Sequence, residues 1–280
     1  STIKGNDDYR CFIVDPQLAG DRDVIATWVH PGNPKIVHHV ILFEVKSSAA
    51  AEVKKLDDAE AGPGYTCFTG VGFVNQHIRW ITSWAPGGEG GRTPEGTGLR
   101  LTKGSVLVMQ VHYNLLNGRG EEDQSKVDLW YSDQPVAKPA LILPLAHLGI
   151  GIPAGVKNHV ETYVESMDSS WPTLTLYGAS GHMHLLGKAI SLEVERKDGT
   201  KECLLDIPKW DFHWQGMYMY DKPTVVGPGD KVRMKCTYDN SRQNQPFIDG
   251  VQQTPRDVSW GEGTLDEMCL GLVYTTGANF

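Results

Sequence analysis

The amino-acid sequence predicts an all-β protein made of two tandem antiparallel β-sandwich domains of the jelly-roll kind. Short runs rich in β-branched and aromatic residues recur along the chain, and turn-forming residues, among them 31 glycines and 16 prolines, separate them. Many short strands of this kind are typical of sandwiches and jelly rolls. The length of 280 residues suggests about two domains, at roughly 150 residues per domain.

The runs that predict strands extend over most of the chain. Asp198 and Gly199 stand between two alternating runs, which is a strong signal for a tight hairpin turn. The apolar segment 139–155 is interrupted by prolines and is too short to span a bilayer, so it is expected to form strands with a turn. The other expected strands lie within residues 35–45, 104–116, 126–132, 173–180, 189–207, 231–239 and 269–276.

Three further segments complete the expected organisation. Residues 47–62 have helical composition, so a short helix is expected there. The glycine-rich segment 85–98 is expected to be a flexible surface loop, since it lacks the lysine and the strand–helix context of a phosphate-binding loop. Prolines interrupt the pattern near the middle of the chain, which predicts one domain in residues 1–138 and a second in residues 139–280.

Charge and cysteine content narrow the classes of function. A formal charge of -8 and the lack of a basic run argue against a nucleic-acid partner. The cysteines form no C-x-x-C pair, which argues against a zinc ribbon or a thioredoxin motif. Widely spaced cysteines suit a secreted or periplasmic protein with one or two disulfides, and buried free thiols are the alternative. The cysteines are Cys11, Cys67, Cys203, Cys236 and Cys269.

Histidines inside the predicted strands are candidate metal ligands. His38 and His39 are adjacent, and His112 lies in another strand. Neighbouring residues of a regular strand face opposite sides, so the first two can reach one ion only at a strand end or a bulge. His182 and His184 are two residues apart and would share one face of a strand. For any isolated histidine, the alternative is a hydrogen-bonded core or surface residue.

A methionine would decide which metal binds. Two imidazoles joined by a thioether select copper, especially Cu(I), because methionine sulfur is a poor ligand for Zn, Mg or Ca. Met183 stands between the two histidines and is expected to face away from their ion. Met268 begins a late strand, but the pattern alone does not distinguish it from a methionine that fills the core.

Five motifs resemble those of the copper type II, ascorbate-dependent monooxygenases, in the order and approximate spacing of that family: VHHVILF, LVMQVHYN, GHMHLLG, GDKVRMKCTYD and GTLDEMC. The family includes peptidylglycine α-hydroxylating monooxygenase and dopamine β-monooxygenase. The resemblance covers nearly the whole chain and implies one copper site in each domain. The implied ligands of the electron-transfer copper are His38, His39 and His112. The implied ligands of the oxygen-binding, catalytic copper are His182, His184 and Met268.

Gln110 matches a glutamine of the family and lies two residues before His112, so it should share the strand face of that ligand. A supporting role at the copper cofactor is expected, with ordinary hydrogen bonding as the alternative. The resemblance also implies a disulfide between Cys236 and Cys269 that would fix Met268 at its copper. Cys11 with Cys67 is the second expected pair, which leaves Cys203 as the odd thiol.

The activity that the resemblance implies is hydroxylation of a C–H bond of a small organic substrate. O2 and an external one-electron reductant such as ascorbate would be consumed, with two copper ions per chain. A copper-binding protein for storage, sensing or delivery is the main alternative, and a β-sandwich interaction module with incidental histidines is the third. Two complete ligand sets favour the enzyme, because a simple carrier needs no pair of separate sites.

The sequence differs from the peptide-amidating members of the family at positions that bind the substrate. Ser180 stands where those enzymes use an arginine to bind the substrate carboxylate, and Leu270 and Leu272 replace an asparagine and a tyrosine. An arginine–carboxylate contact is among the stronger polar interactions. We therefore expect a neutral, apolar or aromatic substrate in place of a peptide that ends in glycine.

Overall fold

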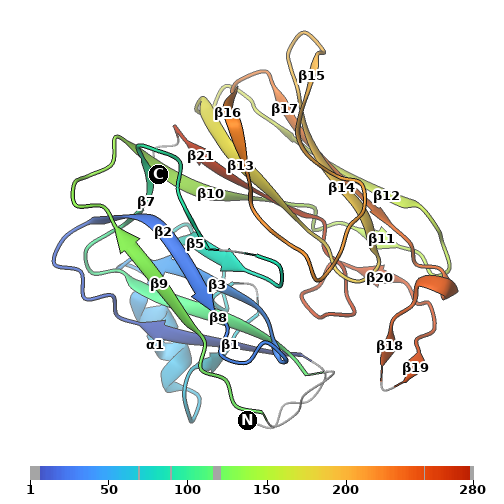
Figure 1. Cartoon of the computed structure of the whole chain (residues 1–280), viewed down its shortest axis with the longest axis horizontal. Coiled ribbons are helices and arrows are strands. Elements are labelled where there is room, and N and C mark those ends of the chain that lie inside the picture. Colours follow the sequence, from blue (N-terminus) through green and yellow to red (C-terminus); the bar gives the residue numbers. More distant parts are fainter. Residues whose placement is uncertain (1–6, 69, 89, 116–120, 249, 278–280) are drawn as a thin grey trace. The chain divides into compact units, whose positions relative to one another are not determined.

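The structure, a computed structural model, describes residues 7–68, 70–88, 90–115, 121–248 and 250–277. Its regular structure is nearly all β-strand, which confirms the predicted all-β class. The helix α1 (Ala50–Asp58) lies within the segment expected to be helical. No helix among the described residues is long and apolar enough to cross a membrane. The chain separates into two compact units, Ser1–Ile142 and Leu143–Phe280 (Figure 1).

The first unit contains a run of antiparallel strands in the order β5–β3–β8–β1–β4. A second group forms where β2 pairs with β6, β7 and β9. The strands are β1 (Asp7–Val14), β2 (Arg22–His30), β3 (Val37–Val45), β4 (Tyr65–Thr66), β5 (Ile78–Trp84), β6 (Gly91–Arg92), β7 (Thr97–Leu101), β8 (Val106–Asn114) and β9 (Lys126–Tyr131), followed by β10 (Lys138–Ala146).

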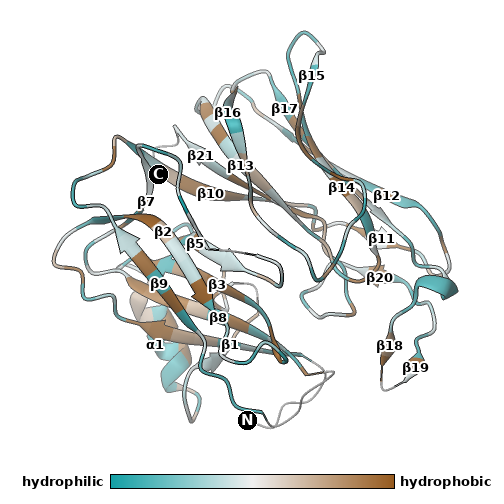
Figure 2. Ribbon diagram, in the orientation of Figure 1, coloured by the Kyte–Doolittle hydropathy of each residue, from teal (hydrophilic) through white to brown (hydrophobic). Residues whose placement is uncertain are grey.

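The strands β3 and β8 are covered on both faces, which is why they are rich in valine and other apolar residues. On one face, Val40 and Val111 pack with Val29 of β2. On the other face, Phe43 packs with Val53 of α1 and with the residues around Cys11 and Cys67. Figure 2 shows the hydrophobic residues along these strands and a helix α1 that is hydrophobic on only part of its surface.

The glycine-rich segment 85–98 differs from the expected loop, because part of it belongs to the sheet. The short strand β6 lies within it and pairs with β2, and β7 already begins at Thr97. Gly90 has no room for a side chain, since the indole ring of Trp28 lies 2.6 Å from where a Cβ atom would be. The glycine therefore permits a close approach of two chain segments.

The second unit is a sandwich of two antiparallel sheets, β16–β13–β21 and β12–β17–β14–β15. Their inner faces enclose one core, in which Ala179 and Val273 of the first sheet pack with Leu192 and Met234 of the second. The strands are β11 (Gly151–Ile152), β12 (His159–Ser166), β13 (Leu174–His182), β14 (Gly187–Glu195), β15 (Lys201–Ile207), β16 (Tyr218–Val226), β17 (Lys231–Tyr238), β18 (Phe247–Ile248), β19 (Val251–Gln252), β20 (Val258–Ser259) and β21 (Leu270–Thr276), with a 3-10 turn at Arg242–Asn244.

Both expected disulfides are present, and the odd thiol is the expected one. Cys236 of β17 bonds to Cys269, directly before β21, and so joins the two sheets of the second unit. Cys11 of β1 bonds to Cys67 in the first unit. Cys203 is a free, exposed thiol on β15. The hairpin between β14 and β15 also turns at Gly199 as predicted, with a positive φ of 85°.

Candidate metal centres

The first unit brings the side chains of His38, His39 and His112 together, with one ring nitrogen from each within 4.8 Å of the others. Nδ1 of His112 is 3.3 Å from Nδ1 of His38 and 3.4 Å from Nδ1 of His39. Imidazole nitrogens bound to one first-row metal ion at about 2.0–2.1 Å lie roughly 3.3 Å apart when the angle between them is tetrahedral. The three converging nitrogens therefore fit a single ion.

A β-bulge explains how two adjacent histidines reach one point. His39 lies opposite His112 in the register of β3 with β8, whereas Val37 lies opposite Tyr113. His38 is therefore an extra residue that has no partner position on β8. Such a bulge turns a side chain that would otherwise face the other side of the sheet. The irregularity that adjacent ligands require is present in β3.

Two residues of β1 contact the His112 ring, one at Nε2 and one on the ring face. Nε2 of His112 is 2.8 Å from Oδ1 of Asp7, and since a carboxylate accepts, Nε2 carries the proton and Nδ1 keeps its lone pair for a metal. The ring of Tyr9 stacks on the imidazole, with centroids 4.1 Å apart. Burial lowers the pKa of His112 although Asp7 opposes the shift, so the neutral, metal-binding form is favoured.

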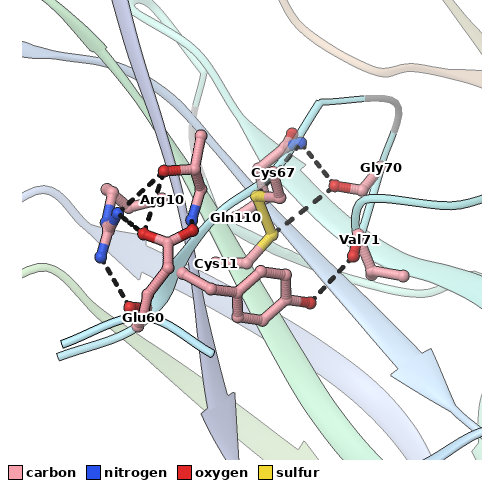
Figure 3. The surroundings of a disulfide bond; sticks show 10 residues. Arg10, Cys11, Glu60, Cys67, Gly70, Val71 and Gln110 are labelled. Atoms are coloured by element: carbon pink, nitrogen blue, oxygen red, sulfur yellow. Dashed lines mark hydrogen bonds and ion pairs between the residues drawn. A yellow bond between two sulfur atoms is a disulfide. The ribbon is translucent and has the colours of Figure 1, made fainter. Parts of the chain in front are cut away.

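Gln110 lies on the same strand as His112, opposite Cys11 of β1. Its side chain is 2% exposed, and Nε2 donates to the carbonyl oxygen of Gly70 at 2.6 Å, beside the Cys11–Cys67 disulfide (Figure 3). The amide therefore supports the loop that follows Cys67.

The second unit carries His182 and His184 at the end of β13, with ring centroids 5.1 Å apart. His182 is the last residue of the strand, and His184 lies in the connection after it. The two therefore do not lie on one regular strand, which differs from the expectation. A Cβ atom at Gly181 would meet Ile190 of the core, so His182 must point to the opposite face of the sheet. Met183 is fully buried in the core and faces away from the pair, as expected.

Hydrogen bonds determine which nitrogens of this pair are open to a metal. Nδ1 of His184 is 3.0 Å from the carbonyl oxygen of Asp266, which only accepts. Nδ1 of His182 is 2.6 Å from Oε1 of Gln215, whose own Nε2 donates to the carbonyl of Phe212. Both imidazoles therefore carry their proton on Nδ1 and leave the lone pair of Nε2 for a metal.

Met268 lies directly before Cys269, the disulfide cysteine that precedes β21, and is 9% exposed. The preceding Glu267 is fully buried, and its carboxylate accepts hydrogen bonds from the backbone N–H groups of His184, Leu186 and Met268. Burial raises the pKa of Glu267 to about 8, although these donors oppose the shift. Glu267 thus ties the methionine segment to the connection that carries His184. Two imidazoles and a thioether form a donor set that suits Cu(I).

Four residues that form hydrogen bonds with the candidate ligands were not identified from the sequence. Asp266 and Glu267 lie within the motif GTLDEMC, so their position was a usable signal, whereas Asp7 lies well before the first motif. Gln215 lies in an irregular segment between β15 and β16, where no periodicity or spacing indicates a role.

The residues that differ from the peptide-amidating enzymes lie beside His182. In the register of β13 with β21, His182 is opposite Leu270 and Ser180 is opposite Leu272. Alternate residues of a strand share a face, so these four side chains lie on the face turned away from the core. Two leucines, of which Leu272 is buried, and one hydroxyl group thus lie on the face of the candidate ligand, and none of them carries a positive charge.

Comparison with known proteins agrees with this donor chemistry. Residues 147–275 match the copper type II ascorbate-dependent monooxygenase C-terminal domain. The putative DBH-like monooxygenase protein 2 of Homo sapiens is 24% identical over 261 residues, which cover 86% of this chain and 47% of that protein. Dopamine beta-hydroxylase of Equus caballus is 24% identical over 287 residues, covering 95% of this chain and 43% of the enzyme. The chain thus spans less than half of the length of these relatives.

Among solved structures, the glycosylasparaginase PNGase F of Flavobacterium meningosepticum covers 98% of this chain and 90% of its own, at a TM-score of 0.34 and 9% identity. A likeness of that size carries no argument about this protein. The sequence matches carry the argument: they confirm the resemblance to the copper type II ascorbate-dependent monooxygenases, and residues 147–275, within the second unit, match the C-terminal domain of that family.

Proposed function

We propose that this chain is a monooxygenase core that binds two copper ions and hydroxylates a C–H bond of a small organic molecule. The observation that carries the proposal is the presence of two separate donor sets, one in each compact unit. One set has three converging imidazole nitrogens, and the other has two imidazoles with open Nε2 atoms, whose segment Glu267 joins to the backbone of Met268. The two sets would be the electron-transfer site of a domain near residues 1–138 and the oxygen-binding site of a domain near residues 139–280.

Copper would supply the redox chemistry that side chains lack, so that C–H, O2, two electrons and two protons give C–OH and water. The thioether of Met268 would favour the reduced ion, and three protein ligands would leave a coordination position open for O2. Ascorbate or another external donor would deliver the electrons one at a time. Gln110 would act indirectly, by keeping the loop after Cys67 in place next to the first site.

We also propose a neutral, apolar or aromatic substrate. Ser180, Leu270 and Leu272 give the face around His182 no cation that could bind a carboxylate. Lys188 of β14 donates to the side chain of Asn244. A charged hydrogen bond contributes about 1.5–3 kcal/mol, so losing the arginine contact should weaken carboxylate substrates by roughly one to two powers of ten.

Secretion or periplasmic location is part of the same proposal. Two disulfides join strands of the protein, and such bonds persist in oxidising compartments.

The test is copper analysis followed by oxygen consumption with ascorbate and a panel of neutral aromatic, neutral aliphatic and carboxylate-bearing substrates. We expect two copper ions per chain, uptake of O2 that depends on a neutral substrate, and one atom of labelled O2 in the product. Two bound coppers without substrate-dependent oxygen uptake would favour the copper-binding alternative. Efficient hydroxylation of an acylated glycine peptide would show that the inference from Ser180 is wrong.

A further inference from the structure

We propose that Glu267 is the positioning residue of the second metal centre, and that its buried carboxylate keeps the segments of His184 and Met268 at one point. The inference rests on the proposed function, because it takes these two residues as ligands of one copper ion.

The contacts of the carboxylate lead directly to both ligands. Oε2 of Glu267 accepts from the backbone N–H of His184 at 2.9 Å and from that of Met268 at 3.3 Å. The backbones of two ligand residues from distant parts of the chain thus meet on one oxygen atom. Oε1 accepts from the backbone N–H of Leu186 at 2.6 Å. A side chain with a single acceptor atom at the place of Oε2 could not also accept from Leu186, which fixes the turn after His184.

The connection that carries His184 depends on this carboxylate for its shape. It is a tight turn, in which the N–H of Gly187 donates to the carbonyl of His184 at 3.3 Å. The indole Nε1 of Trp210 donates to the same carbonyl at 3.2 Å. The N–H groups on the inner side of the turn are buried and meet Glu267. Without an acceptor they would remain unsatisfied, which is costly enough to make the turn rearrange.

A second buried glutamate shows what is unusual about Glu267. Glu44 of the first unit is also fully buried, but it forms an ion pair with Arg79 at 2.9 Å and accepts from Thr102. The hydrogen bonds of Glu267 run instead to backbone N–H groups, those of His184, Leu186 and Met268. Glu44 thus joins side chains of neighbouring segments, whereas Glu267 joins the backbones of two candidate ligands.

The test compares Glu267→Gln and Glu267→Asp with Glu44→Gln as the matched control for the loss of a buried carboxylate. Copper affinity is measured for each site by chelator competition, and copper–sulfur scattering from Met268 is measured by X-ray absorption of the Cu(I) form. The glutamine variant keeps the size but loses one acceptor. The aspartate variant keeps the charge but withdraws the carboxylate by one methylene group.

We expect both Glu267 variants to bind copper at the second site about 10- to 100-fold more weakly, which is the usual loss when a residue that supports a metal ligand is changed. Their copper–sulfur signal should also be reduced. The site of His38, His39 and His112 should be unchanged, and Glu44→Gln should lower stability without altering either site. Wild-type affinity and copper–sulfur signal in the variants that fold would overturn the inference, as would an equal effect of Glu44→Gln. If Glu267→Gln does not fold, the aspartate variant decides alone. A wild-type chain that lacks the second copper would instead refute the proposed function.

Discussion

The two candidate metal centres differ in the imidazole nitrogen that is available to the metal. In the first unit the imidazoles converge through Nδ1, and Nε2 of His112 donates to Asp7. In the second unit Nδ1 of each histidine is used in a hydrogen bond, to Gln215 or to the carbonyl of Asp266, so Nε2 keeps its lone pair for a metal. In His112, His182 and His184 the ligating nitrogen is set by the partner of the other nitrogen, and that partner comes from a different part of the chain.

The devices that align the ligands differ as well. A bulge in a continuous strand brings His38 beside His39, whereas a turn beyond a strand end carries His184. The first device depends on strand pairing, and the second depends on one buried carboxylate. We therefore expect the first centre to be preorganised by the sheet and the second to be more sensitive to changes in its surroundings.

The largest expected effect comes from deleting one ligand of each centre. His112→Ala should lose the copper of the first unit and keep the other, and His182→Ala should do the reverse. Each should lower the affinity of its own site by more than the roughly 100-fold that a supporting residue contributes. Metal analysis of both variants measures this. A protein that loses both ions on either change would mean that the centres are not independent.

Removing a disulfide should be the next largest effect. Cys236→Ser with Cys269→Ser should lower the free energy of unfolding by about 2–5 kcal/mol and weaken the second centre, because Met268 precedes Cys269. Cys11→Ser with Cys67→Ser should affect the first centre, where Gln110 holds the loop after Cys67. Denaturant unfolding and copper analysis are the measurements, and Cys203→Ser is the control that should change neither. If both disulfide variants weaken the same centre, the assignment of one bond to each site is wrong.

Changing the partners of the ligating imidazoles should have a smaller effect. Asp7→Ala and Gln215→Ala should each weaken copper binding about 10- to 100-fold at their own site, equivalent to roughly 1.4–2.7 kcal/mol. Asp7→Asn and Gln215→Glu are matched controls that keep an acceptor oxygen for the same N–H. Chelator competition measures each affinity. Equal losses in the acceptor-keeping variants would contradict the assigned ring protonation.

The smallest expected effect is a pH dependence of the free energy of unfolding of the metal-free protein. Burial places the folded-state pKa of His112 below its ordinary value of 6.5. The unfolded chain therefore takes up the proton first, so this contribution to stability is complete above pH 6.5 and is lost as the pH falls toward the folded pKa. The slope from one group is at most about 1.4 kcal/mol per pH unit. Denaturant unfolding from pH 7 to pH 5 measures it, and the slope should shrink in His112→Gln. An unchanged slope would exclude His112 as its source.

Much of the fold could be predicted because its signals are local. Runs of β-branched, aromatic and other apolar residues marked β3, β8 and β13, and the Asp198–Gly199 dipeptide marked the hairpin. The glycine-rich segment was misjudged in part because its packing against Trp28 is a long-range contact that no local pattern encodes.

The candidate site was predictable only where its residues lie in recognisable motifs. The condition for His38 and His39, a bulge, follows from strand geometry, but its position depends on pairing with β8. Gln215 lies 33 residues after His182 in an irregular segment, so its contact arises only when the chain folds. The buried role of Glu267 was hidden for a related reason, since an acidic residue is usually exposed and nothing in its neighbours indicates a counter-charge.

The bulge in β3 also suggests a rule for engineering metal sites into sheets. In a regular antiparallel pair, adjacent residues face opposite sides, so a designer who wants three imidazoles at one point on two strands must place two of them at alternate positions of one strand. Here one inserted position lets two strands provide all three, because His38 is added to the opposed pair of His39 and His112. Grafting would require one insertion, one opposing histidine and a carboxylate on the next strand, as Asp7 lies on β1. An existing β-sandwich with an exposed sheet edge could receive such a site without a new loop.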